Sequence, residues 1–305
     1  MDDFVVVTAN FMLPVLLGVV TSMGFGAYTY VSKKLPLLIL RPGHKKGTET
    51  PEDYGLPYDH IGLRVTETIE LDAYFVPATT PVAKANLIIL HGVGSCKEVY
   101  LPNAAPLCAL GYNLFLADQR QHGKSGGRYL TYGHYEKYDV AKMTDWLAER
   151  TGRLKTGIYG NSMGAAVALQ AMAHDHRLAF GLIESTFTDL RSITNAYAGQ
   201  MIGRKVPLWL SDFLLRRAGK IADFDPFAIQ PLRDVAKIDR PLQFIHGDSD
   251  ARIDLDNARQ LYAASIANDK DLYVVPKGDH ADLWEVGDKG YPEKWFGFLQ
   301  RMVDE

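Results

Sequence analysis

The sequence contains few cysteines, since Cys96 and Cys108 are the only two among 305 residues. Two cysteines cannot build the disulfide framework that stabilises small secreted domains. The chain also lacks a CxxC pair and a Gly-rich phosphate loop. The sequence therefore indicates neither a metal ion nor a nucleotide cofactor.

The chain also lacks an excess of charge of one sign. Its 33 Lys and Arg against 36 Asp and Glu give a formal net charge of -3 at pH 7, without a basic stripe. No nucleic-acid-binding motif is present, so we expect no nucleic-acid partner. With 47% hydrophobic and 23% charged residues, the chain can bury a substantial core in one large domain.

One stretch near the N-terminus has no charge at all. No charged residue occurs over the 29 positions from Phe4 to Ser32. A helix of that length would reach about 43 Å, more than the roughly 30 Å hydrocarbon core of a bilayer. We therefore predict a hydrophobic helix over residues 1–34, with 4–32 as a single-pass membrane anchor. The alternative is a helix that packs on the domain or lies on a membrane surface.

The charges that flank this stretch predict its processing and orientation. Asp2 and Asp3 precede it where a signal peptide would carry basic residues, so we expect the segment to be retained. Five basic residues follow it closely: Lys33, Lys34, Arg41, Lys45 and Lys46. Because positive charge marks the cytoplasmic side of a membrane protein, the sequence predicts a cytoplasmic domain over residues 35–305.

Short apolar runs alternate with helical stretches through most of that domain. The runs cover residues 86–90, 113–117, 156–159, 178–183, 242–245 and 271–275. Such alternation predicts an α/β fold with a mostly parallel central sheet and helices on both faces. Two alternating segments before the first run, at 62–66 and 71–77, predict an antiparallel hairpin.

The alternation stops between residues 186 and 240. This stretch has apolar helices but no convincing strand, so we expect a helical cap inserted over the carboxyl ends of the strands. Its apolar side chains are candidates to line an acyl or aryl pocket, or they pack the cap onto the sheet. The candidates are Leu208, Trp209, Phe213 and Leu214.

Residues 160–164 (GNSMG) place Ser162 between two glycines, after an apolar run and before a strongly helical segment. In a strand-to-helix turn of this kind, the glycines let the two backbones approach, and the serine adopts a strained, exposed conformation. The amide groups at the helix N-terminus suit a transition state that carries an oxyanion. We predict that Ser162 is a nucleophile; the alternative is a structural turn.

The loop after the run at 86–90 has the sequence HGVGS and is the candidate for the oxyanion hole. Its glycines allow backbone amides to face a substrate oxygen. We predict that the N–H groups of Val93 and Met163 form the hole. His91 is expected to organise this loop by hydrogen bonds, although it is also a candidate base.

A serine nucleophile needs a base, and the base needs an acid to orient it. His280 follows the last apolar run and Asp250 follows the one before it. Reactive groups gather at the carboxyl ends of parallel strands, and the chain order Ser162, Asp250, His280 is the one expected there. We therefore predict that these three residues form a catalytic triad.

Three other carboxylates are alternatives to Asp250. Asp248 is expected to cap its turn, and Asp254 to cap the helix that begins near residue 255. Glu184 ends the strand after the Ser162 helix, from which it could also reach the base. Otherwise Glu184 is a buried, hydrogen-bonded brace.

Together these motifs resemble the α/β-hydrolase superfamily, from about residue 60 to the end. The stretch 118–125 (DQRQHGKS) is part of the resemblance, with Gln121 where many relatives have glycine. Residues 132–139 and 184–187 look most similar to the cinnamoyl-esterase and prolyl-oligopeptidase-like branch. The resemblance implies that Asp118 and Arg120 are structural.

The sequence thus predicts a serine esterase that requires no cofactor. Ser162 would form an acyl-enzyme, His280 would act as base and then acid, and Asp250 would orient it. The expected partner is a small-molecule ester with an apolar acyl or aryl group. A serine peptidase or amidase of the same fold is the first alternative. A non-catalytic, membrane-anchored interaction protein is the second.

Overall fold

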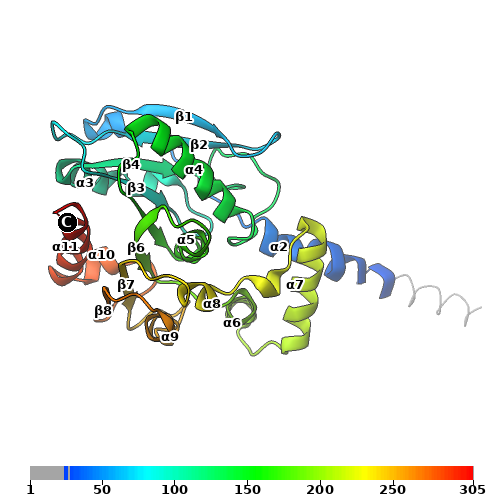
Figure 1. The fold of residues 1–305 in the computed structure, drawn as a ribbon. Coiled ribbons are helices and arrows are strands. Elements are labelled where there is room, and N and C mark those ends of the chain that lie inside the picture. Colours follow the sequence, from blue (N-terminus) through cyan, green and yellow to red (C-terminus); the bar gives the residue numbers. More distant parts are fainter. Residues whose placement is uncertain (1–23, 27, 305) are drawn as a thin grey trace, which may run out of the picture.

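The computed structural model describes residues 24–26 and 28–304, and its centre is an eight-stranded sheet (Figure 1). The strand order is β1-β2-β4-β3-β5-β6-β7-β8. Strand β2 is antiparallel to β1 and β4, and the other neighbours are parallel. The strands are β1 (Asp59–Arg64), β2 (Glu70–Val76), β3 (Ala85–Leu90), β4 (Tyr112–Ala117), β5 (Thr156–Asn161), β6 (Leu178–Glu184), β7 (Leu242–Gly247) and β8 (Lys270–Val275). The predicted α/β fold is confirmed.

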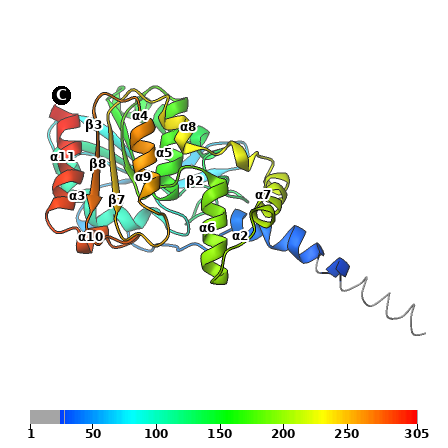
Figure 2. The same ribbon diagram turned by 90° about the horizontal axis from the view of Figure 1, so that it is seen from below.

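Helices cover both faces of the sheet (Figure 2). One face packs against α3 (Ala104–Leu110) and α11 (Gly290–Asp304). The other packs against α4 (Glu136–Thr151), α5 (Met163–His174), α8 (Pro231–Val235) and α9 (Asp256–Ala264).

The side chains of β3 show how the strands hold these two layers. Leu87 and Ile89 belong to the core on the α3 side, whereas Ile88 and Leu90 belong to the core on the α5 side. Successive side chains of a strand point to opposite faces, so a strand covered on both faces is apolar at most of its positions. For this reason the continuous apolar runs of the sequence identified the strands.

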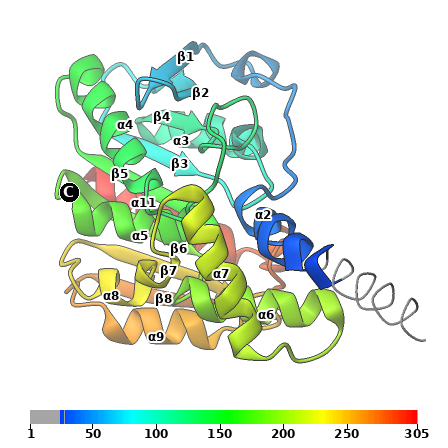
Figure 3. The ribbon, with the colours of Figure 1, turned by 90° about the vertical axis from the view of Figure 1, so that its right-hand side faces the viewer.

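The segment between β6 and β7 is helical. It contains α6 (Leu190–Ile202), α7 (Leu208–Ala222), the short 3-10 helix η4 (Pro226–Ala228) and α8. Helix α7 packs beside α2 (Pro36–Leu40), as Figure 3 shows. Leu40 and Leu215 are both fully buried in the apolar cluster between them.

The predicted localisation, a single-pass N-terminal anchor with a cytoplasmic domain, must be corrected. Across residues 24–26 and 28–304, no helix has both the length and the apolar character needed to cross a bilayer. Residues 24–26 and 28–29 are helical, and the π-helical η1 (Tyr30–Lys34) and α2 follow them with five residues each. Moreover, Ser32 is buried and its carbonyl accepts a hydrogen bond from Arg217 of α7. The rest of the predicted anchor, residues 4–23 and 27, lies outside the described residues.

Candidate active site

Ser162 occupies the turn between β5 and α5, with φ 54° and ψ -117°. The glycines on either side explain why the turn can close. A Cβ atom on Gly160 would lie 2.4 Å from the Gly164 carbonyl carbon, and one on Gly164 would lie 2.3 Å from the Leu90 carbonyl oxygen. Any side chain at either position would therefore push α5 away from the sheet. The local geometry is the strand, turn and helix that the sequence predicts.

The structure brings Ser162, His280 and Asp250 together at the carboxyl edge of the sheet. His280 Nε2 lies 3.0 Å from Ser162 Oγ, and His280 Nδ1 lies 2.8 Å from Asp250 Oδ2. All three side chains are buried. Because a carboxylate can only accept, Nδ1 carries the proton, which leaves Nε2 free to accept the hydroxyl proton of Ser162. This arrangement can deprotonate a serine hydroxyl.

The loop after β7 holds Asp250 as a carboxylate. Its Oδ1 atom accepts hydrogen bonds from the amides of Arg252 (2.9 Å) and Ile253 (2.8 Å). Its Oδ2 atom lies 3.3 Å from His246 Nε2 as well as 2.8 Å from His280 Nδ1. Burial alone would raise the pKa of Asp250, but the hydrogen bonds from His246, His280 and the backbone outweigh it and hold this pKa well below its usual range. The group is therefore ionised at neutral pH.

The three alternative carboxylates have other partners. Asp248 Oδ1 accepts from the amide of Lys277 (2.7 Å), and Asp254 Oδ1 accepts from the amide of Asp256 (2.8 Å) just before α9. Asp254 therefore caps the turn before α9, whereas Asp248 joins its loop to the loop after β8 instead of capping its own turn.

Glu184 is also committed to neighbours other than His280. It accepts hydrogen bonds from Asn161 Nδ2 (2.7 Å) and the Tyr291 hydroxyl (2.6 Å). Burial raises the pKa of Glu184, and these hydrogen bonds only partly oppose the shift. Glu184 thus supports the turn around Ser162, called the elbow below, through its hydrogen bond with Asn161.

The loop after β3 lies directly beside Ser162. A Cβ atom on Gly92 would sit 3.3 Å from Ser162 Cβ. Met163 is the first residue of α5, and Val93 is partly exposed at the loop surface. Within the part of the chain that the structure describes, neither of these two residues uses its amide N–H in a hydrogen bond. Both amides are therefore available to a ligand.

Two neutral histidines hold this loop. His91 Nδ1 donates to the Gly92 carbonyl (2.8 Å), and His91 Nε2 accepts from the Gln119 amide (3.0 Å). His122 Nε2 accepts from the Gly94 amide (3.0 Å). Burial, together with the neighbouring His122, lowers the pKa of His91 to about 4, and burial also lowers the pKa of His122. His91 is thus placed to organise the loop, in keeping with the sequence.

The loop that follows β4 is anchored by buried ion pairs. Asp118 accepts hydrogen bonds from the Lys97 ammonium (2.9 Å) and the Lys124 amide (2.9 Å), and Arg120 pairs with Asp139. These contacts agree with the structural role that the resemblance implies for Asp118 and Arg120. Gln121 has φ 67°, a left-handed conformation that glycine adopts without strain.

The apolar residues proposed from sequence for substrate binding lie on α7, in two different settings. Leu208 and Trp209 occupy its first turn and are 54% and 70% exposed. Phe213 and Leu214 are half-buried.

A different apolar group adjoins the elbow. It combines Ala166, one turn after Ser162, with side chains that follow β6 and β7 and with one face of α6. We refer to it as the α6 wall; it consists of Ala166, Phe187, Ile253, Tyr132, Ile193 and Tyr197. The sequence analysis missed this group, although Ile193 and Tyr197 are spaced by four residues, as one face of a helix requires.

Comparisons with known proteins agree with this architecture. Residues 81–200 match the family described as "Serine aminopeptidase, S33". The uncharacterised protein YqkD of Bacillus subtilis (strain 168) is 31% identical over 271 residues, which cover 83% of this chain and 79% of that protein. The chain belongs to the α/β-hydrolase superfamily. The predicted resemblance is therefore confirmed at the level of the superfamily.

Two further proteins, with lower sequence identity, are also similar to this α/β hydrolase. Protein bem46 of Schizosaccharomyces pombe is 25% identical, over 86% of this chain and 81% of that one. The structure of the Pyrococcus furiosus esterase Pf2001 superimposes with a TM-score of 0.72 at 24% identity, covering 86% of this chain and 98% of that one. The latter likeness supports the fold.

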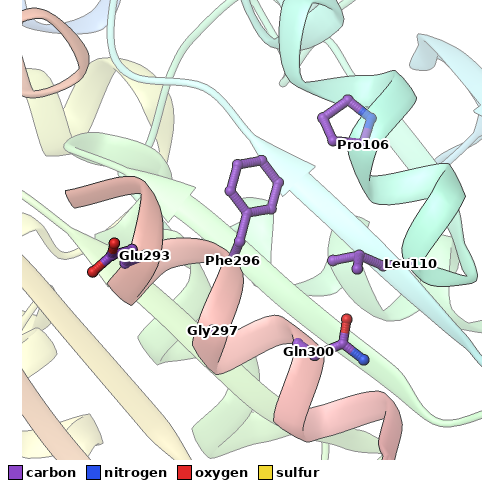
Figure 4. A pocket seen from close by; sticks show the side chains of 6 residues that line it. All are labelled: Pro106, Leu110, Glu293, Phe296, Gly297 and Gln300. Carbon is purple, nitrogen blue, oxygen red and sulfur yellow. The ribbon is translucent and has the colours of Figure 1, made fainter. Parts of the chain in front are cut away.

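Other hollows of this α/β hydrolase are separate from the Ser162 elbow. One of about 400 Å³ lies between α3 and α11 and is open to one side (Figure 4). It is lined by Pro106, Leu110, Glu293, Phe296, Gly297 and Gln300, and none of these is a predicted site residue. In the described ranges, no group of three or more His, Cys, Asp or Glu side chains is placed to hold a metal ion.

Proposed function

We propose that this α/β hydrolase cleaves carboxylic esters through an acyl-enzyme formed on Ser162. The observation that carries the proposal is the chain of hydrogen bonds from Ser162 Oγ through the His280 imidazole to Asp250. It supplies a nucleophile, a base of the right tautomer and an ionised acid that orients the base. We also propose that residues 186–240 act as the cap over this site.

The reaction follows from the positions of the acceptors and donors. Ser162 Oγ attacks the ester carbonyl carbon while His280 Nε2 takes the hydroxyl proton, and Asp250 stabilises the resulting imidazolium. The oxyanion of the tetrahedral intermediate accepts hydrogen bonds from the Val93 and Met163 amides. His280 then protonates the departing alkoxide. A water molecule activated by His280 attacks the acyl-enzyme, which releases the acid and restores Ser162.

The α6 wall supports a substrate with an apolar acyl or aryl group. Phe187, Ile193 and Tyr197 belong to the same cluster as Ala166, whose amide donates to the Ser162 carbonyl. Such a surface stabilises an apolar group by removing it from water, at about 25 cal/mol per Å². The proposal therefore needs no charged anchor for the ester.

A serine aminopeptidase is the second candidate, because the matching family carries that description. An aminopeptidase needs a free carboxylate to bind the α-ammonium group of its substrate. Glu184, which ends β6 beside the elbow, is already hydrogen-bonded by Asn161 and Tyr291. Asp250 is likewise committed to its own donors. These commitments favour the ester over the peptide.

The proposal is tested with p-nitrophenyl esters of graded chain length and with amino-acid p-nitroanilides. Wild type should hydrolyse the esters, and Ser162→Ala should lose at least about 10³-fold in kcat. Ser185→Ala is a matched control, since its hydroxyl is buried without a hydrogen-bond partner among the described residues, and it should retain activity. Equal ester turnover by wild type and Ser162→Ala would refute the nucleophile. A preference for the anilides would support the aminopeptidase.

A further inference from the structure

A second histidine contacts the carboxylate that orients His280. His246 lies in β7 and is fully buried. Its Nε2 atom is 2.7 Å from the Ile253 carbonyl oxygen and 3.3 Å from Asp250 Oδ2. Because both neighbours are acceptors, Nε2 carries the proton, which is donated to the Ile253 carbonyl while Asp250 Oδ2 lies beside the same N–H group.

The surroundings of the other ring nitrogen fix the tautomer of His246. Nδ1 is buried and has no hydrogen-bond partner in the part of the chain that the structure describes. A proton on that atom would be an unsatisfied buried donor, which is costly. His246 therefore has a fixed tautomer, with its Nε2–H group beside Asp250 Oδ2.

The contacts of Asp250 divide between its two oxygens. The backbone amides of Arg252 and Ile253 bind Oδ1, and both come from the same loop as Asp250. Among the residues that the structure describes, the two imidazoles are the groups that reach Oδ2. Since His280 belongs to the loop after β8, His246 is the one of these two imidazoles that stands on a strand of the central sheet.

We propose that His246 is a positioning residue, which holds Asp250 Oδ2 toward His280 and takes a share of its negative charge. This inference rests on the proposed function, because it concerns the same ester hydrolysis. Without the His246 donor, the charge on Oδ2 acts on His280 alone, and the carboxylate loses a contact that restrains its rotation. Both the rate and its pH dependence should then change.

Other charged and titratable groups surround this pair. Glu184 faces His280 from the end of β6, and Asp279 precedes His280 and accepts from the Ala251 amide. Arg252 and Tyr197 lie on the side of Asp250 toward α6. These groups stay the same in every variant below, so a change in the pH profile reports on position 246.

The test compares His246→Gln, His246→Asn and His246→Leu. The amide nitrogen of glutamine can occupy the place of Nε2, whereas asparagine is too short to do so and leucine has no donor. We expect His246→Gln to stay within about threefold of wild type in kcat. The asparagine and leucine variants should lose about tenfold or more in kcat with little change in KM. In these two, the acid limb of kcat/KM should move to higher pH by about half a unit, because an unshared carboxylate charge favours the imidazolium.

Gln243→Leu provides a control on the same strand. Gln243 is buried in β7, but its amide nitrogen contacts Phe244 and Asp271 rather than the site. This variant should lower the thermal unfolding midpoint without moving the pH profile. If His246→Leu does not fold, the comparison of asparagine with glutamine still decides the question.

The outcomes separate this inference from the proposed function. If all three His246 variants keep the wild-type kcat and pH profile while Ser162→Ala is inactive, the proposed role of His246 is overturned. The proposed esterase activity would then still stand. An equal loss in the glutamine and asparagine variants without a shift of the acid limb would also overturn it, since that pattern reports only damaged packing. Absence of Ser162-dependent hydrolysis in wild type would contradict the proposed function itself.

Discussion

His280 Nε2 lies 3.0 Å from Ser162 Oγ, although 118 residues separate the two in the chain. Ser162 follows β5 and His280 follows β8, and two further strands lie between these in the sheet. Parallel strands place all their carboxyl ends at one edge, so the loops that leave them can meet there. The pairing is thus a consequence of the sheet order.

The first prediction distinguishes Asp250 from Glu184 as the acid that orients His280. Asp250→Asn should lower kcat for a p-nitrophenyl ester by about 10⁴-fold, because an amide favours the wrong imidazole tautomer. Glu184→Gln should cost less than about tenfold, since Glu184 contacts Asn161 and Tyr291 instead. Steady-state kinetics of both variants measure the difference. A larger loss in Glu184→Gln would assign the orienting role to Glu184.

The second prediction concerns the strain at the elbow. Ser162 has φ 54°, which costs a residue with a Cβ atom about 1–3 kcal/mol. Ser162→Gly should therefore unfold with a free energy about 1 kcal/mol higher than Ser162→Ala, after the greater entropy of unfolded glycine is subtracted. Both variants should be inactive. Urea denaturation of the two measures this difference, and a less stable glycine variant would contradict a strained serine.

The third prediction concerns the pH dependence of stability through His91. Its folded pKa of about 4 lies below the model-peptide value of 6.5, so the unfolded chain binds a proton that the folded chain does not. The contribution of His91 to the free energy of unfolding is fully present above pH 6.5 and is lost as the pH falls toward 4. This free energy then falls by about 1.4 kcal/mol per pH unit.

His91→Gln measures this contribution. Glutamine does not titrate, so the free energy of unfolding of the variant should fall less than that of wild type between pH 6.5 and 4. The two slopes should differ by at most about 1.4 kcal/mol per pH unit, the contribution of one proton. Urea unfolding at several pH values gives both curves. Parallel curves would show that His91 titrates alike in the folded and unfolded states.

The fourth prediction locates the acyl pocket. Ile193→Ala and Tyr197→Ala should lower kcat/KM for octanoate or aryl esters by about tenfold or more, and for acetate by much less, because the α6 wall contacts only the longer group. Leu208→Ala and Trp209→Ala on the exposed turn of α7 serve as the comparison and should leave the chain-length profile unchanged. If instead only the α7 variants alter the chain-length profile, the acyl pocket is lined by Leu208 and Trp209, as the sequence predicts.

The sequence was most informative where the geometry is local or the burial is complete. The elbow needs only five neighbouring residues, and its glycines are dictated by backbone contacts that no side chain could fit. Strand β3 is buried at all six positions, so its apolar run identifies it without knowledge of its neighbours. The same reasoning placed Asp250 and His280 at the ends of β7 and β8.

The sequence was least informative where a residue's role depends on what packs against it. The contact between His246 and Asp250 depends on the path of the loop after β7, which no local pattern specifies. Ile193 and Tyr197 are ordinary residues of α6 until the fold sets that helix beside the elbow. Apolar composition near the N-terminus suggested a membrane span, but residues 24–26 and 28–304 contain no helix that is long and apolar enough for one.

The most direct test of the account is the intact mass of the protein after reaction with a fluorophosphonate, which phosphonylates an activated serine. Wild type should gain the mass of one phosphonyl group and lose esterase activity in step, whereas Ser162→Ala should gain none and His280→Ala should react far more slowly. Peptide mapping should place the group on Ser162. Equal labelling of wild type and Ser162→Ala, or a label on another residue, would contradict the assignment of Ser162 as the nucleophile.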